Sequence, residues 1–177
     1  MLNNLTLGPV ALVPVTLEDS SFIVEIRAEA VCKGFLNRGA ECAEMQRRWL
    51  LEYFKRANPQ HDHYFMITES GRKCGTLRVG LLDDHLEMFT WGSWCLMPGL
   101  NPLVAIASYI LAYEVGFAIP QKTYALFEVH KENASVLAFH RRMGAIETGV
   151  IHVDQIEFKM TREAFYKSRY RWIEKIK

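Results

Sequence analysis

Residues 129–145 read VHKENASVLAFHRRMGA, and this stretch decides how the chain folds. It completes an apolar, β-favouring run at 123–129, which predicts a buried strand. After Glu132 and Asn133, apolar side chains recur at helical spacing until Gly144, the residue type that most often ends a helix. The stretch therefore predicts a strand, a polar junction, a short helix and a glycine cap.

Upstream of this unit, strand and helix patterns follow one another without linkers or repeats. Pro9 and Pro14 favour an edge strand at 8–15, because proline cannot donate to a central ladder. Asn101 and Pro102 are typical of a helix start. The expected elements are helices at 17–30, 41–57 and 103–118, and antiparallel strands at 63–69, 73–82 and 86–97, the first two joined by a turn at Ser70 to Arg72.

Downstream, strand patterns at 146–153 and 155–160 precede a helix at 161–177. The whole chain is expected to form one α/β domain, with a core at about 8–160 and a mixed, mostly antiparallel sheet of six to seven strands flanked by helices. The edge near 153–155 offers unpaired backbone groups, so a homodimer is one possible assembly.

Composition excludes several classes of function. The chain has 177 residues, half of them apolar, and a net charge of +1, so it lacks the concentrated basic face that binds nucleic acid. Its four cysteines, Cys32, Cys42, Cys74 and Cys95, form no C-x-x-C pair and have no neighbouring histidine set. We therefore expect reduced thiols, no metal site and no disulfide framework. No apolar run is long enough to span a membrane and no signal segment is recognisable, which favours a cytoplasmic protein.

The spacing of Asn133, His140 and Gly144 carries a resemblance. The pattern N-x-x-S-x-x-F-H-x-x-x-G-A is similar to the strand-to-helix signature of the Gcn5-related N-acetyltransferases, in which a tyrosine usually stands where this chain has His140. The order of elements resembles that fold up to about residue 159. The long helical region before the first hairpin, with Arg27 near the end of its first helix, is similar to the branch that contains ribosomal-protein and amino-sugar nucleotide acetyltransferases.

The resemblance implies acetyl-CoA as co-substrate, with its pyrophosphate on the amides that open the helix at 103–118. Those amides belong to Leu103, Val104, Ala105 and Ile106. Helix N-terminal amides lack partners and carry partial positive charge, so they accept phosphate readily. The family's small residues are replaced by Val104 and Ile106, and these branched side chains are expected to add bulk where the phosphates approach. Weak CoA binding, or a shifted loop using Gly99, is the alternative.

The resemblance also places the pantetheine arm along the strand that contains Trp94, Cys95 and Leu96. Gly92 in that strand indicates a bulge, which would leave an N–H, that of Leu96, for the thioester oxygen. Alternatively, Gly92 only makes room for a neighbouring tryptophan. Asn133 would reach the arm from the other side, or would serve only as a helix cap.

Acetyl transfer to an amine needs a neutral nucleophile, a stabilised oxyanion and a proton for the thiolate. His140 stands at the family's proton-donor position, where an imidazolium would serve near neutral pH, although a histidine on a helix is often only a packing residue. The family's strand glutamate aligns with Trp91, which cannot take a proton. Glu128 and His130 lie on one face of their strand and are candidate bases, of which we favour His130, with Glu87, His85 and a water chain as alternatives.

Two residues are candidates for binding the acceptor. Trp91 offers a ring face to a sugar or aromatic group, and Arg27 offers a partner for a phosphate or carboxylate. Core packing and an exposed helix end are the simpler interpretations. The sequence therefore predicts transfer of acetyl from acetyl-CoA to the primary amine of a small molecule, such as a nucleotide-linked amino sugar. The alternatives are acetylation of a protein N-terminus, as for ribosomal proteins, and an inactive scaffold that kept the fold.

Overall fold

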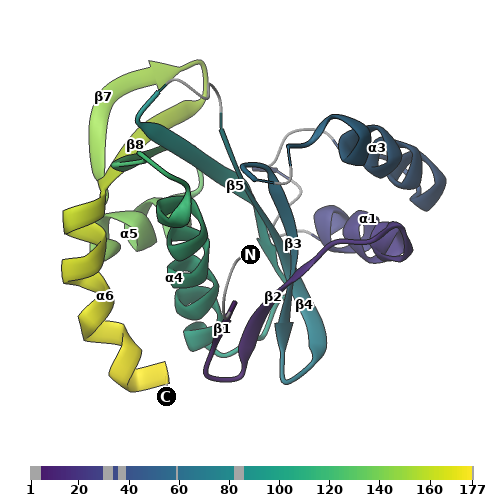
Figure 1. The fold of residues 1–177 in the computed structure, drawn as a ribbon, viewed down its shortest axis with the longest axis horizontal. Helices are drawn as coiled ribbons and strands as arrows, with labels where there is room; N and C mark the ends of the chain where they lie inside the picture. Colours follow the sequence, from purple (N-terminus) through teal and green to yellow (C-terminus); the bar gives the residue numbers. More distant parts are fainter. Residues whose placement is uncertain (1–4, 30–33, 36–38, 59, 82–85, 177) are drawn as a thin grey trace.

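The computed structural model describes residues 5–29, 34–35, 39–58, 60–81 and 86–176, which build an eight-stranded sheet with helices on both faces (Figure 1). Its strands run in the order β1-β2-β3-β4-β5-β6-β8-β7, and every neighbouring pair is antiparallel except β5 and β6. The strands are β1 (Thr6–Leu7), β2 (Val10–Pro14), β3 (His63–Glu69), β4 (Arg72–Gly80), β5 (Met88–Leu96), β6 (Tyr124–His130), β7 (Ile146–His152) and β8 (Gln155–Thr161). The predicted mixed, mostly antiparallel sheet is confirmed.

The sheet has one strand more than predicted, because the chain reverses before β2. Gly8 has a φ of +58° and turns β1 back onto β2, so β2 lies between β1 and β3 and is not the edge. A Cβ on Gly8 would lie 2.5 Å from the carbonyl oxygen of Ile176 at the other end of the chain. A side chain at this position is therefore excluded both by the turn and by the close approach of the C-terminal helix.

Alternate residues of each strand face the two helical layers. A short 3₁₀ turn (Leu17–Asp19), α1 (Ser20–Ala28) and α3 (Ala43–Arg56) cover one face, and α4 (Pro102–Ala118), α5 (Ala134–Met143) and α6 (Arg162–Ile176) lie on the other (Figure 1). In β3, Tyr64 and Met66 pack with α1 and α3, whereas Phe65 and Ile67 join the core under α4. The predicted order of strands and helices is confirmed.

The main core lies between the sheet and α4, which is buried along most of its length. Gly116 permits this contact, because a Cβ there would lie 2.1 Å from the ring of Phe89 on β5. Asn101 caps the helix by accepting the Leu103 N–H at 2.9 Å, and Pro102 begins it. Gly144 ends α5 with a φ of +94°. Both predicted helix boundaries are confirmed.

β5 and β6 pair over only two residues, Met88 with Tyr124 and Phe89 with Ala125. Beyond these pairs the two strands run without a shared ladder, and the sheet forks. At the far side of the sheet, β7 forms the edge, and all seven of its residues are exposed. Whether this edge pairs with a second copy stays a prediction. Among the described residues, no helix is both long and apolar enough to cross a membrane.

Candidate active site in the fork of the sheet

The fork between β5 and β6 contains a cleft of about 400 Å³. Both diverging strands line it, together with the first turns of α5, one residue of α4 and one residue of the connection between α1 and α3. The lining residues are Phe35, Trp91, Gly92, Ser93, Trp94, Cys95, Leu96, Ala105, Phe127, Glu128, Val129, His130, Asn133, Ser135, Val136, Phe139 and His140. Nine of the predicted site residues therefore meet in one cleft: Trp91, Trp94, Cys95, Leu96, Ala105, Glu128, His130, Asn133 and His140.

A β-bulge interrupts β5 where it lines the cleft. Thr76 of β4 is opposite Cys95 and Arg78 is opposite Gly92, so the two residues Ser93 and Trp94 face the single residue between Thr76 and Arg78. Ser93 has a φ of +49°, an uncommon conformation for a residue with a side chain. The bulge predicted from Gly92 is confirmed, and it removes part of the ladder where backbone groups face the cleft.

Gly92 faces open space. Apart from its chain neighbours Trp91 and Ser93, no described residue has a heavy atom within 4 Å of a Cβ built on it. Gly92 therefore does not make room for Trp94, whereas the alternative that it makes room for Trp91 stays a prediction. The absence of a side chain keeps the cleft open beside the bulge.

Thr76 of β4 stabilises the bulge, because its Oγ1 donates to the carbonyl oxygen of Ser93 at 3.1 Å. Thr76 is fully buried. Ser93 and Thr76 are not among the predicted site residues. The signal available for Ser93 was its place directly after Gly92, whereas nothing in the sequence marks Thr76, because its role depends on strand register.

Cys95 corrects the expectation that all the cysteines are reduced. It is disulfide-bonded, with a partner outside the described residues, while Cys42 and Cys74 are free. Its sulfur lies 3.3 Å from the carbonyl oxygen of Ile26 at the end of α1. This bond could not be predicted from the sequence, because cysteines far apart in the chain reveal their pairing only through the fold.

At the start of α4, the branched side chains are buried. Val104 and Ile106 both belong to the main core, so neither side chain projects into solvent at the helix N-terminus. The alternate residue Ala105 lines the cleft with a methyl group. Asn101 engages two of the N-terminal amides, since its side chain accepts from Leu103 and its carbonyl oxygen accepts from Val104 at 2.9 Å.

His140 lies at the inner end of the cleft and is only 2% exposed. Burial lowers its pKa to about 3, and its Nδ1 is buried without a hydrogen-bond partner among the described residues. The ring is therefore a neutral imidazole at pH 7, and the expected imidazolium is wrong for the ligand-free protein. Its aromatic neighbours are Trp91, Trp94, Tyr109, Phe127, Phe139 and Phe158.

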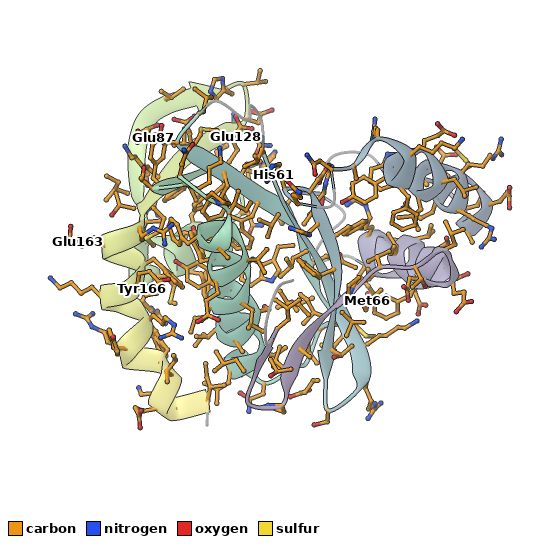
Figure 2. The ribbon with its side chains drawn as sticks, in the orientation of Figure 1. His61, Met66, Glu87, Glu128, Glu163 and Tyr166 are labelled. Carbon is orange, nitrogen blue, oxygen red and sulfur yellow. The ribbon has the colours of Figure 1, made fainter. Side chains whose placement is uncertain are left out.

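The two candidate bases lie on β6 at the mouth of the cleft. Nδ1 of His130 accepts the backbone N–H of Glu132 at 3.2 Å, which places the proton of a neutral ring on Nε2. The carboxylate of Glu128 is about half exposed, and Nε2 of His152 lies 3.8 Å from it. Glu128 and Glu87 lie at the same end of the molecule (Figure 2), but Glu87 is hydrogen-bonded to Thr123 and does not line the cleft. His85 lies outside the described residues.

Asn133 has both of the roles considered for it. Its Oδ1 caps α5 by accepting from Val136 at 3.3 Å, and it also accepts from the Ser135 hydroxyl at 3.1 Å. The residue lines the cleft at the same time. Its side-chain NH₂ makes no hydrogen bond within the described part of the chain, so this donor is available to a ligand.

The two residues that were predicted to bind the amine acceptor differ in position. Trp91 is 6% exposed and packs edge-on against Tyr109 and Tyr113 of α4, so it belongs to the core as well as to the cleft lining. Arg27 lies in the last turn of α1, and its Nε lies 2.7 Å from a Cβ built on Gly39. It is not among the described residues that line the cleft.

Comparison with solved structures agrees with this geometry. Apo FdhC, described as a nucleotide-linked sugar GNAT, is 26% identical to this chain, with 96% of each chain covered and a TM-score of 0.83. The chain has the Gcn5-related N-acetyltransferase (GNAT) fold. Two further GNAT-fold structures are RimJ from Mycobacterium smegmatis with a CoA disulfide and AAC(6′)-Ib with paromomycin and acetyl-CoA.

These two structures share the GNAT fold at lower identity. RimJ is 17% identical, with 96% of this chain and 91% of RimJ covered and a TM-score of 0.78. AAC(6′)-Ib is 15% identical, with 90% of this chain and 97% of the other covered and a TM-score of 0.72. No protein-family model and no curated protein sequence matches the chain. Structure neighbours thus include GNAT acetyltransferases with CoA or acetyl-CoA bound.

Proposed function

We propose that this protein is an N-acetyltransferase that moves an acetyl group from acetyl-CoA to the primary amine of a small molecule. The observation that carries the proposal is the bulged, forked sheet, which opens a cleft between β5 and β6 where the bulge interrupts the ladder. The likeness to FdhC over nearly the whole chain supports it. Because FdhC is described as a nucleotide-linked sugar GNAT, an amino sugar is the acceptor class we favour.

Acetyl-CoA would bind with its pantetheine arm along β5, beside Trp94, Cys95 and Leu96, and with the free amide NH₂ of Asn133 on the opposite wall. Its pyrophosphate would lie at the start of α4, on the amides from Leu103 to Ile106. The inward direction of Val104 and Ile106 supports this placement, because neither side chain blocks that helix end. The hydrogen bond from the Leu103 N–H to the Asn101 side chain must break before that N–H can donate to a phosphate oxygen.

The reaction is a direct transfer. The neutral amine attacks the thioester carbon, the C–N bond forms, and the charge that develops on the carbonyl oxygen is stabilised by a backbone N–H beside the bulge, for which Leu96 is our candidate. The intermediate collapses with cleavage of the C–S bond. The ammonium proton leaves for a base, and the CoA thiolate takes up a proton.

Glu128 is the base that we favour, with His130 beside it on the strand. Glu128 is a carboxylate in contact with solvent at the cleft mouth, whereas the Nδ1 lone pair of His130 already accepts a backbone N–H. His130 in this tautomer presents its Nε2 proton as a hydrogen-bond donor. A neutral His140 can donate a hydrogen bond to the departing sulfur, and the proton for the thiolate then comes from water or from the amine.

The two alternatives have less support. The likeness to RimJ is at 17% identity and concerns the fold, so it does not favour a protein N-terminus as acceptor. The inactive scaffold was motivated by branched residues at the helix end, and those residues point into the core. The remaining argument for the scaffold is that Trp91 stands where the family has a strand glutamate. Glu128 lines the same cleft and could act as the base in its place.

A binding measurement and a transfer assay test the proposal together. Thermal unfolding with acetyl-CoA, desulfo-CoA and ATP should give a raised melting temperature with both CoA compounds and none with ATP, by mass action. Release of free thiol from acetyl-CoA should then depend on an added amino sugar. Absence of any CoA-dependent shift at millimolar ligand would reject the enzyme and leave the scaffold.

Glu128→Gln should lower kcat by about 10²-fold near pH 7, because a general base contributes rate enhancements of that order. Activity should recover towards high pH, where more of the amine is already neutral. Glu147→Gln is the matched control: Glu147 pairs with Arg141 and does not line the cleft. Equal kinetics of wild type and Glu128→Gln at every pH would remove Glu128 from this role.

A further inference from the structure

Three residues stand in one row across neighbouring strands, beside the bulge. Tyr64 of β3 is the register partner of Arg78 of β4, and Arg78 is the partner of Gly92 of β5. Directly opposite residues project to the same face of a sheet. That face is the one covered by α1 and α3, because Tyr64 packs in the cluster they form. Arg78 therefore stands between a tyrosine and the open space above Gly92.

The guanidinium of Arg78 is held in place by its neighbours. Nε and Nη2 donate to the carboxylate of Asp62 at distances of 2.9–3.1 Å, and the ring of Tyr53 lies 4.9 Å from the guanidinium carbon. The Tyr53 hydroxyl also donates to Asp62, at 3.2 Å. Nη1 makes no hydrogen bond to any described residue, and the side chain is 34% exposed. A fixed, partly exposed arginine thus keeps donors for a ligand.

A second cation acts on the same tyrosine. Burial raises the pKa of Tyr64, and the positive charges of Arg27 and Arg78 both act against this rise. Arg27 comes from α1 and Arg78 from β4, so the two charges belong to different layers of the fold. The charge of Arg78 is balanced by Asp62, and Arg27 adds a second positive charge on this side of the sheet.

An acceptor can approach the bulge from this face. On the opposite face, Trp91 and the tyrosines of α4 fill the space with buried rings. Over Gly92, in contrast, no described residue other than its chain neighbours has an atom within 4 Å of a Cβ built there, and Gly92 lines the cleft. A molecule placed over Gly92 would reach the bulge with one end and Arg78 with the other.

We propose that Arg78, with Arg27 near it, forms the subsite for a phosphate group carried by the amine acceptor. The inference rests on the proposed transferase function and adds Arg78 as the residue that would hold the phosphate of a phosphorylated amino sugar. Arginine suits this task because its planar donors match phosphate oxygens, and the ion pair with Asp62 removes the entropy loss of fixing a long side chain on binding. The phosphate is either a sugar phosphate ester or a nucleoside diphosphate linkage.

Binding titrations of CoA-loaded protein test the subsite, with glucosamine, glucosamine 6-phosphate and UDP-glucosamine as probes. Wild type should bind at least one phosphorylated probe about tenfold or more tightly than glucosamine. Whichever of glucosamine 6-phosphate and UDP-glucosamine binds more tightly shows whether the phosphate is a sugar phosphate ester or a nucleoside diphosphate linkage. Arg78→Gln should abolish this preference and leave glucosamine binding unchanged. Arg48→Gln is the matched control, since Arg48 is an exposed arginine of α3 paired with Glu44 and should leave all three affinities unchanged.

Loss of Arg78 leaves Asp62 with the Tyr53 hydroxyl but without its cationic partner, which destabilises a partly buried carboxylate. The double variant Asp62→Asn with Arg78→Gln removes both charges and keeps the fold testable by its melting temperature. It should bind glucosamine like the wild type and show no preference for phosphate.

The subsite is rejected if wild type binds neither phosphorylated probe more tightly than glucosamine, or if Arg78→Gln keeps the preference. Failure of the transferase itself has a separate readout, because it appears as the absence of a CoA-dependent thermal shift in the wild type.

Discussion

At the scale of single residues, His140 shows how burial sets a charge state. The ring is enclosed by aromatic side chains, and no carboxylate is among the causes that shift its pKa, so the charged form loses its hydration without compensation. The unfolded chain takes up a proton near pH 6.5, whereas the folded protein resists protonation until about pH 3. The contribution of His140 to the free energy of unfolding is therefore fully present above pH 6.5, and it is lost as the pH falls towards 3.

His140→Phe should make the protein less sensitive to mild acid. Between pH 7 and pH 5, we expect the free energy of unfolding of wild type to fall by about 2 kcal/mol more than that of the variant. Denaturant unfolding at the two pH values measures both. Other titrating groups are shared by the two proteins, so they cancel in the difference, and an equal fall in both would show that His140 titrates normally.

Sequence spacing placed His140, Asn133 and Gly144 correctly on their helix, because helical periodicity depends only on neighbours in the chain. It could not give the ionisation state of His140, which depends on rings contributed by β5, β6, α4 and β8. The direction of Val104 and Ile106 was missed for a related reason. Alignment to a loop pattern gives a position in the chain, whereas the face of α4 that turns inward is set by packing on the sheet.

At the scale of elements, the β5 bulge is the feature on which the proposed chemistry depends. Glycine inside a strand predicted it, but the side chain that stabilises it, Thr76, lies on the neighbouring strand. Strand register, and hence this partner, is fixed by pairing of segments that are distant in sequence.

Thr76→Val should disturb the bulge without changing the volume of the side chain. The Ser93 carbonyl oxygen loses its buried donor, which should cost about 1–2 kcal/mol of stability. We expect kcat to fall about tenfold or more, because donors that stabilise the oxyanion must be accurately placed. Thr76→Ser keeps the hydroxyl and should retain most activity. If Thr76→Val is destabilised but keeps its full kcat, the bulge does not need this hydrogen bond to hold its geometry.

At the scale of the whole molecule, the order of elements was predictable because strand and helix patterns are local, and turn residues such as Gly71 mark their ends. The fork was not visible in the sequence alone, since nothing in β5 or β6 reveals that their pairing stops after two residues. The short strand β1 was missed because two residues carry no period.

Contact between α4 and the sheet should depend on Gly116. Gly116→Ala places a methyl group 2.1 Å from the Phe89 ring, so we expect destabilisation of about 1–3 kcal/mol, measured by denaturant unfolding. Phe89→Leu should relieve part of this overlap, so the double variant should lose less than the sum of the single losses. Additive losses would mean that the ring moves aside freely.

The narrow link between β5 and β6 divides the chain into two consecutive parts, one ending with α4 and the other beginning at β6. Each part contains all of its own antiparallel partners, and the turn between them holds Gln121 with a φ of +65°. The helical layer joins the parts: Tyr113 stacks on Phe165 at 5.0 Å, and Arg162 donates to the carbonyl oxygens of Phe117 and Lys122 at 2.7 Å. Two fragments made by cleavage at that turn would thus remain associated through α4 and α6, as a non-covalent complex with the cleft at the seam.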